Sequence, residues 1–264
     1  RWQSILQDKQ NLLDSASEVL TASEYVLNRG DRQPQRLREL VESGDLETVY
    51  AEDGYQQRLQ TRLAQVNDEA TLQQQLRFFR HREMVRIIWR DLSGWADLAE
   101  TVRELTALAD CCVEQALNKL YQWQTELLGT PMDELDQPQH LIVLGMGKMG
   151  AGELNLSSDI DLIFTYPDDG ETQGARKSLT NEEFFTRLGR KLIQALDNVT
   201  VDGFVFRVDM RLRPFGESGS LVASFDAMED YYQTQGREWE RYAMIKARPV
   251  TGSEQDKKAT SDLL

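Results

Sequence analysis

The sequence predicts an α+β protein, with a first half made of helices and a second half that combines helices with a small mixed sheet. Three observations support this prediction. Apolar residues recur at helical spacing over residues 68–91 and 95–128. Short apolar runs and an alternating stretch, both typical of strands, come only after residue 130. Hydrophobic residues make up 40% of the 264 residues, which is enough to form a sizeable core.

We divide the chain into a helical region over residues 1–132, a mixed domain over 133–252 and a truncated polar tail over 253–264. The chain begins with Arg1 rather than Met, and it ends within that polar stretch. We therefore expect it to be part of a longer protein.

The helical region contains two strongly periodic segments and one weaker one. Residues 68–91 and 95–128 each repeat apolar side chains every three or four positions, and a break of the second helix near Asp110 is left open. Gly129 follows as a helix-ending residue. A weaker helical pattern covers residues 6–26. We interpret this region as a helical bundle packed against the mixed domain; the alternative is a docking surface for a protein partner.

Strands and helices alternate in the mixed domain. Thr180 and Glu183 form a capping box, and the apolar positions that follow it predict a helix to Leu196. Between residues 203 and 213 apolar and polar side chains alternate strictly, which predicts one strand with Asp209 on its polar face. The other expected elements are strands at 141–144 and 160–164, a glycine-rich loop at 145–150, and helices at 224–235 and 237–247.

Composition excludes several classes of protein. Acidic residues outnumber basic ones by 44 to 30, and the net charge of −14 disfavours nucleic-acid binding unless basic residues gather in one cleft. No apolar run approaches the roughly 20 residues of a membrane span, so no membrane partner is expected. Cys111 and Cys112 are adjacent, which suits buried helix positions in a reducing compartment and thus a cytoplasmic protein.

Two aspartates carry the first chemical signal. Asp159 and Asp161 are two residues apart at the start of a predicted strand, so their side chains lie on one face. Two carboxylates this close repel each other unless a cation lies between them, and Mg²⁺ prefers such oxygen ligands. The alternative for this pair alone is a solvated strand end without a metal.

Further groups strengthen the metal interpretation. The glycines at 145–150 permit close approach of a phosphate, and Gly147, Lys148, Ser157 and Ser158 are candidate phosphate or nucleotide ligands. A strand beside the first one would bring Asp209 against the two aspartates. Three carboxylates beside a glycine loop suit phosphoryl or nucleotidyl transfer with two metal ions.

Arginines share the strand face of Asp209. The side chains of Arg207, Arg211 and Arg213 suit the non-bridging oxygens of a phosphate, or they neutralise the acidic cluster; the sequence leaves both open. For Lys246 and Arg248, a solvated helix face and a phosphate contact are equally open.

Other familiar sites are excluded. The glycine pattern at 145–150 matches a dinucleotide fingerprint, but Asp159 follows too soon for the helix and second strand of that fold. Met149 stands where a P-loop requires Ser or Thr. His81 and His140 are isolated, and no nucleophile–histidine pair is visible.

Three longer motifs resemble one family. They are Gly145-Met-Gly-Lys-Met-Gly-Ala-Gly-Glu-Leu-Asn-Leu-Ser-Ser-Asp-Ile-Asp-Leu-Ile-Phe164, the stretch from Asp202 to Gly216, and Tyr231-Tyr232 followed by Gly236-Arg-Glu-Trp-Glu-Arg-Tyr242. They resemble the bifunctional glutamine synthetase adenylyltransferase/adenylyl-removing enzymes, over about residues 67–252. That family has two related nucleotidyltransferase domains. The sequences at 157–161 and 214–218 are similar to the corresponding motifs of the N-terminal, adenylyl-removing domain.

The resemblance implies a polymerase-β-like fold for 133–252, in which Asp159, Asp161 and Asp209 are catalytic and bind two Mg²⁺ ions, with Mn²⁺ as an alternative. It implies removal of AMP from a modified tyrosine of glutamine synthetase, with phosphate attacking and ADP released. Its partners would be glutamine synthetase, the PII signal protein, ATP, ADP and phosphate. Two alternatives stay open: ATP-dependent adenylylation of glutamine synthetase, and a non-catalytic module that senses nucleotide or PII.

Overall fold

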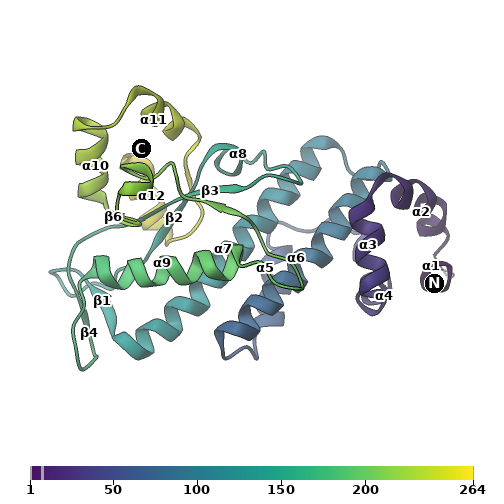
Figure 1. Ribbon diagram of the computed structural model, residues 1–264, viewed down its shortest axis with the longest axis horizontal. Coiled ribbons are helices and arrows are strands. Elements are labelled where there is room, and N and C mark those ends of the chain that lie inside the picture. Colours follow the sequence, from purple (N-terminus) through teal and green to yellow (C-terminus); the bar gives the residue numbers. More distant parts are fainter. Residues whose placement is uncertain (1, 7–8, 264) are drawn as a thin grey trace.

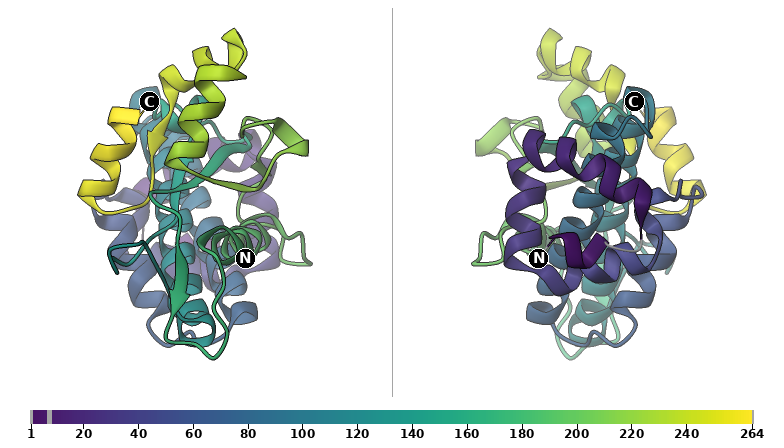
Figure 2. Two further views of the ribbon diagram at one scale, coloured as in Figure 1. Left: turned by 90° about the vertical axis from the view of Figure 1, so that its left-hand side faces the viewer. Right: turned by 90° about the vertical axis from the view of Figure 1, so that its right-hand side faces the viewer.

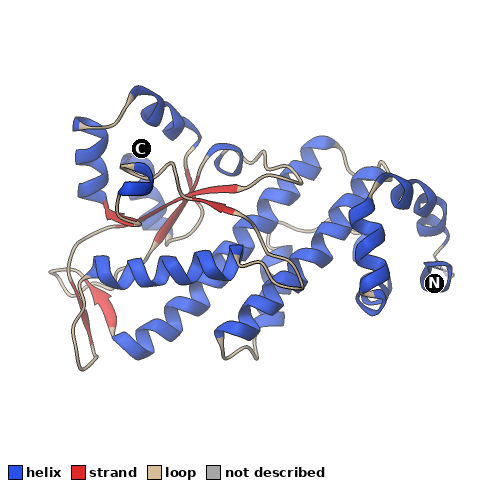
Figure 3. Ribbon diagram, in the orientation of Figure 1, coloured by secondary structure: helices blue, strands red, loops and turns tan. Residues whose placement is uncertain are grey.

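The computed structural model describes residues 2–6 and 9–263 and has the expected α+β composition, with helices on both sides of a small central sheet (Figures 1 and 3). The two views of Figure 2 look onto opposite ends of the molecule. The C-terminal helices stand in front in one view, and the N-terminal helices in the other. The long helices α6 and α7 join the two ends (Figure 1).

The first half is helical, as predicted. Its two long helices are α6 and α7, which Asp68 and Asp97 cap by accepting hydrogen bonds from Thr71 and Glu100 N–H groups. Helix α7 runs without a break through Asp110, so the break left open there does not occur. The elements are α1 (Trp2–Leu6), α2 (Gln10–Ala22), α3 (Glu24–Arg32), α4 (Pro34–Glu42), η1 (Asp45–Glu47), α5 (Gly54–Leu63), α6 (Glu69–Leu92) and α7 (Leu98–Leu128).

The weak helical pattern over 6–26 is the least accurate prediction in this half. Residues 7 and 8 lie outside the described part of the chain. The rest forms α2 and α3 rather than one helix, because Ser23 ends α2 and its hydroxyl caps α3 by accepting from Val26 N–H at 3.3 Å. Helices α4 and α5 were not predicted.

The central sheet is mixed. Strand β3 pairs with β2 antiparallel on one side and, on the other, with β5 and β6 in parallel at its first and last residues. The strands are β2 (Ile142–Gly145), β3 (Ile160–Tyr166), β5 (Val208–Asp209), β6 (Val222–Ser224) and β7 (Arg248–Pro249), and β1 (Thr130–Met132) pairs with β4 (Glu171–Gln173) in a separate two-stranded sheet.

The predicted strand over 203–213 is wrong in extent, because only β5 is a strand there. Gly203, at φ +92°, closes a tight turn, and the N–H of Val205 then donates to the carbonyl of Leu196 at the end of α9. Val205 is fully buried rather than on the polar face. Beyond β5 the carboxylate of Asp209 accepts from the N–H of Arg211 and turns the chain. The alternation therefore reflects turns packed on α9 rather than a long strand.

The remaining helices follow the predicted order. Both halves of the Thr180–Glu183 capping box are formed at the start of α9. The segment expected as a polar tail forms α12, whose described residues end at 263. These elements are α8 (Gly147–Gly150), α9 (Asn181–Asp197), η2 (Gly216–Ser218), α10 (Phe225–Thr234), α11 (Glu238–Ala243), η3 (Met244–Lys246) and α12 (Glu254–Leu263).

One hydrophobic core joins the helical region to the sheet. Helix α7 packs against α6 on one side and α9 on another, so buried residues such as Leu105 and Phe164 belong to the same cluster. Cys111 and Cys112 are fully buried and unbridged, as predicted for helix core positions. Within the described ranges, none of the helices combines the length and apolar character that a membrane crossing requires.

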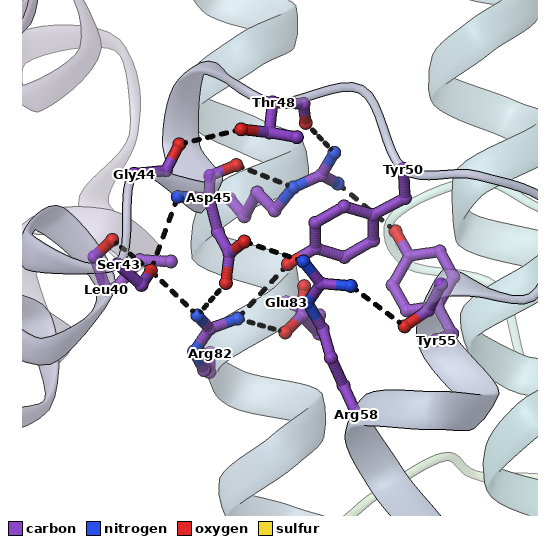
Figure 4. Close-up of polar contacts among 12 residues, drawn as sticks. Leu40, Ser43, Gly44, Asp45, Thr48, Tyr50, Tyr55, Arg58, Arg82 and Glu83 are labelled. Atoms are coloured by element: carbon purple, nitrogen blue, oxygen red, sulfur yellow. Dashed lines mark hydrogen bonds and ion pairs between the residues drawn. The ribbon is translucent and has the colours of Figure 1, made fainter.

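A buried ionic network holds the loop between α4 and α5 against α6 (Figure 4). The carboxylate of Asp45 accepts from Arg58 at 2.8 Å and from Arg82. Although burial opposes it, these bonds lower the pKa of Asp45 to about 2. Arg86 is fully buried and donates to both carboxylate oxygens of Glu104 on α7, at 2.8 and 3.0 Å. This network fixes the loop to the two central helices.

We expect Glu104→Gln to lower the free energy of unfolding by about 3 kcal/mol, because it leaves the Arg86 guanidinium buried without a counter-charge. Urea denaturation at neutral pH measures the loss. Lys191→Gln is the control: it breaks an ion pair with Glu69 whose side chains are 33% and 40% exposed, and should cost less than about 1 kcal/mol. Equal losses in the two variants would contradict this account of the network.

Candidate active site

Two parallel strands bring the predicted carboxylates together. Strands β3 and β5 pair in register, with Ile160 opposite Val208 and Asp161 opposite Asp209. Residues opposite each other on neighbouring strands point to the same face of a sheet. Asp159 precedes β3 by one residue and shares the face of Asp161. All three carboxylates therefore lie at the same edge of the sheet.

The electrostatics of Asp161 reflect this crowding. Burial, followed by the negative charges of Asp209 and Asp159, raises the pKa of Asp161, while Arg211 opposes the shift. The pKa of Asp209 is lowered instead, chiefly by hydrogen bonds from the Arg211 side chain. The negative charges of Asp209 and Asp159 thus make the ionised form of Asp161 less favourable.

Two of the three predicted arginines contact the aspartates. The Nε of Arg207 lies 2.5 Å from Asp159 Oδ1, and its Nη2 donates to the carbonyl of Ser157 at 3.0 Å. Arg211 Nε lies 3.0 and 2.8 Å from the two carboxylate oxygens of Asp209, and 72% of its side chain is exposed. In this structure, these two side chains neutralise the acidic cluster.

Arg213 has a different environment. Its Nη1 donates to the carbonyl of Met210 at 2.7 Å, and its Nη2 donates to the carbonyl of Glu217 at 3.2 Å. The side chain thus braces the turn that follows β5. The hydrogen bonds of the Arg213 guanidinium are therefore to backbone carbonyl groups and not to the three carboxylates.

The glycine-rich segment, which we expected to be a loop, is a tight turn. Residues 145–150, called the glycine turn below, comprise the end of β2 and the single helical turn α8. The N–H of Met146 donates to the carbonyl of Asp161 at 2.9 Å. Gly147 has φ +54°, and a Cβ at this position would lie 3.2 Å from Asp161 Oδ2. The turn therefore packs directly against the central carboxylate.

The other predicted phosphate ligands lie around this turn. Lys148 is exposed, in the middle of α8. Ser157 is exposed before β3, whereas the Ser158 hydroxyl donates to Asn155 Oδ1. The N–H groups of residues 150–153 donate to carbonyl groups within the turn. A phosphate would therefore bind to the N–H groups at the start of α8.

The donor set fits a hard divalent cation in chemistry. Three carboxylates supply oxygen ligands, and burial, together with the charges of Asp209 and Asp159, raises the pKa of Asp161. Among residues 2–6 and 9–263, however, no three His, Cys, Asp or Glu side chains converge as ligands of one ion. Asp159 and Asp209 face Arg207 and Arg211 instead.

His81, which the sequence left as an isolated residue, supports the strand that carries Asp209. Its Nε2 lies 2.8 Å from the carbonyl of Asp202, and its Nδ1 lies 2.7 Å from the hydroxyl of Tyr25. Burial first, then the charges of Arg29 and Arg80, lowers the pKa of His81 to about 3. The neutral ring therefore donates to Asp202 and accepts from Tyr25. A partner 121 positions away leaves no signal in a single sequence.

Carboxylates, arginines and a glycine turn lie together at one edge of the sheet. Such a set of groups is typical of proteins that bind phosphoryl or nucleotidyl groups. The chain belongs to the glutamate-ammonia ligase adenylyltransferase family, whose family model matches residues 13–262. This result confirms the resemblance seen in the sequence.

Two relatives with the same printed name agree with the family match. The chain is 57% identical over 244 residues to the bifunctional glutamine synthetase adenylyltransferase/adenylyl-removing enzyme of Pseudomonas aeruginosa, and this match covers 92% of the chain and 25% of the relative. It is 56% identical over 245 residues to the enzyme of that name from Nitrosococcus oceani, with the same coverage. The chain thus spans about a quarter of the length of these relatives.

We expect Asp161→Asn to stabilise the metal-free chain at pH 7. A raised pKa means that the folded state binds the proton more tightly, so stability falls as pH rises from the ordinary carboxyl pKa through the raised one. The substitution removes that loss, so the variant should be more stable than the unchanged chain at neutral pH. The gain should vanish below about pH 3.5.

Asp209→Asn is the matched control. The lowered pKa of Asp209 means that its carboxylate stabilises the fold above the ordinary carboxyl pKa, so this variant should lose stability at pH 7. Thermal unfolding of both variants between pH 3 and pH 8, with a chelator present, measures the two effects. A loss of stability in both at neutral pH would show that the carboxylates do not repel one another.

Proposed function

We propose that this chain removes AMP from adenylylated glutamine synthetase by phosphorolysis. The observation that carries the proposal is the register of β3 and β5, which places Asp161 beside Asp209 with Asp159 on the same face. The names of the relatives support the substrate, since each includes both glutamine synthetase and adenylyl removal. The glycine turn and two arginines beside these aspartates suit the phosphate groups of such a reaction.

The reaction exchanges one phosphorus–oxygen bond for another. An oxygen of inorganic phosphate attacks the phosphorus of the adenylyl group, the bond to the tyrosine oxygen breaks, and that oxygen takes up a proton. The products are ADP and unmodified tyrosine. Arg207 and Arg211 offer guanidinium groups to the non-bridging oxygens, and the start of α8, from Gly147 on, offers backbone N–H groups.

The carboxylates would hold the metal. Two Mg²⁺ or Mn²⁺ ions bound by Asp159, Asp161 and Asp209 would supply positive charge for the attacking and leaving oxygens. In the structure the two arginines balance this negative charge. Metal binding therefore requires Arg207 and Arg211 to turn from the carboxylates, which frees them for phosphate.

The sequence motifs of the site favour the adenylyl-removing activity over ATP-dependent adenylylation, because residues 157–161 and 214–218 are similar to those of the family's N-terminal nucleotidyltransferase domain. Phe215, within the second stretch, has φ +60° and makes an edge-to-face contact with Tyr231, with ring centroids 4.5 Å apart. A polymerase-β-like fold, a cytoplasmic location and the PII signal protein as a partner belong to the same proposal. Neither nucleic acid nor a membrane is a partner in it.

We expect the chain to release ADP from adenylylated glutamine synthetase only when Mg²⁺ and inorganic phosphate are both present. Asp209→Asn should reduce the rate by at least about a hundredfold, because it removes a charge aimed at the reacting groups. Asp168→Asn, at the far end of β3, is the control and should keep the rate of the unchanged chain. Chromatography of the released nucleotide measures both.

Other outcomes would point elsewhere. AMP-tyrosine formed from ATP without phosphate would replace the proposed reaction with adenylylation. Nucleotide binding without any product, in a chain shown to be folded, would favour the sensing module. A near-normal rate in Asp209→Asn would remove the carboxylate set from the mechanism.

A further inference from the structure

We propose that Arg248 and Asp110 form a clamp that positions the glycine turn against Asp161. The inference rests on the function proposed above, because it assigns to this turn the task of presenting backbone N–H groups to phosphate. Neither residue belongs to the carboxylate set. Both are positioning residues, since they act through the turn rather than on the reacting atoms.

Arg248 reaches the end of the turn from the edge of the sheet. It lies in β7, opposite Gly145. Its Nε donates to the carbonyl of Gly150 at 3.3 Å, and its Nη2 donates to the carbonyl of Met149 at 3.2 Å. Carbonyl groups at the end of a helix lack partners in the next turn. The guanidinium therefore supplies donors where α8 ends.

Asp110 holds that guanidinium from the helical region. Its two carboxylate oxygens lie 3.0 and 2.8 Å from Arg248 Nη2, across 138 positions of sequence. The side chains of Arg248 and Asp110 are 38% and 23% exposed. Burial raises the pKa of Asp110 to about 6 against the opposing charge of Arg248; Glu114 on α7 and Lys257 on α12 also act on it. The pair connects α7 to the sheet edge.

Close packing transmits this restraint to the candidate site. A Cβ at Gly150 would lie 1.8 Å from the carbonyl of Lys246 and 2.4 Å from the carbonyl of Gly145, so the turn has no room to move toward η3. At its other end Met146 N–H donates to Asp161, and Gly147 lies against the Asp161 carboxylate. A shift at the clamp would thus displace the turn relative to Asp161.

The chain offers a matched control two residues from Arg248. Lys246 forms an ion pair with Glu153 at 3.1 Å, with side chains 53% and 61% exposed. This pair also joins η3 to the residues after α8, but at the surface and without contacts to the carbonyl groups of the turn. Lys246→Gln therefore removes a charge at the same place and leaves the clamp intact.

Hydrogen exchange tests the clamp without any assumption about activity. In Arg248→Gln and Asp110→Asn, the amides of residues 150–153 should exchange at least about tenfold faster than in the unchanged chain. The amides of β2 and β3 should keep their rates, which shows that the variants are folded. Arg248→Lys should restore part of the protection, since an ammonium group replaces some of the lost donors. Unchanged exchange in both clamp variants would overturn the proposal.

Kinetics then test the positioning role. The KM for inorganic phosphate should rise by about tenfold or more in both variants while kcat changes less, whereas Lys246→Gln should keep the hydrogen exchange of the unchanged chain. The double variant should be no worse than Arg248→Gln alone, because Asp110 acts through Arg248. Faster exchange with an unchanged KM would overturn the positioning role. Faster exchange in a chain whose unsubstituted form releases no ADP would instead overturn the proposed function and leave the clamp supported.

Discussion

The parallel pairing of β3 with β5 is the constraint on which the site depends. It lasts for only two residues, yet these residues place Asp161 opposite Asp209. So short a strand has little stability of its own, and its register is set from outside. The end of α9 accepts the N–H of Val205, and His81 holds the carbonyl of Asp202 in the preceding turn. The concentration of negative charge at the sheet edge follows from this pairing.

The helical region therefore does more than cover the sheet. Helix α6 supplies His81 to the turn before β5, and α7 supplies Asp110 to the arginine that holds the glycine turn. Both helices are themselves joined by the buried pair of Arg86 and Glu104. Polar contacts of this kind fix position as well as adding stability, because their donors and acceptors must meet at defined distances. A displacement of α6 relative to α7 would therefore shift the turn before β5 relative to the glycine turn.

The sequence predicted the features that depend on neighbours along the chain. The capping box that begins at Thr180 and the buried helix positions of Cys111 and Cys112 are local patterns and were predicted correctly. The aspartate spacing also identified the residues that the structure brings to one edge. The short strands β6 and β7 gave no usable signal, since two or three residues carry no periodicity, and β5 was predicted only as part of a longer strand. The contacts of His81 with Asp202 and of Arg248 with Asp110 were equally invisible, because each joins residues more than a hundred positions apart.

We expect Asp159, Asp161 and Asp209 to bind metal as one set. Electron paramagnetic resonance of Mn²⁺ added to the folded chain can measure this binding, because free and bound ions give different signals. Asn substitution at any of the three aspartates should weaken binding by at least about tenfold, whereas Asp226→Asn, in the separate acidic group near the end of β3, should leave it unchanged. Equal Mn²⁺ affinity in all of these variants would contradict this expectation.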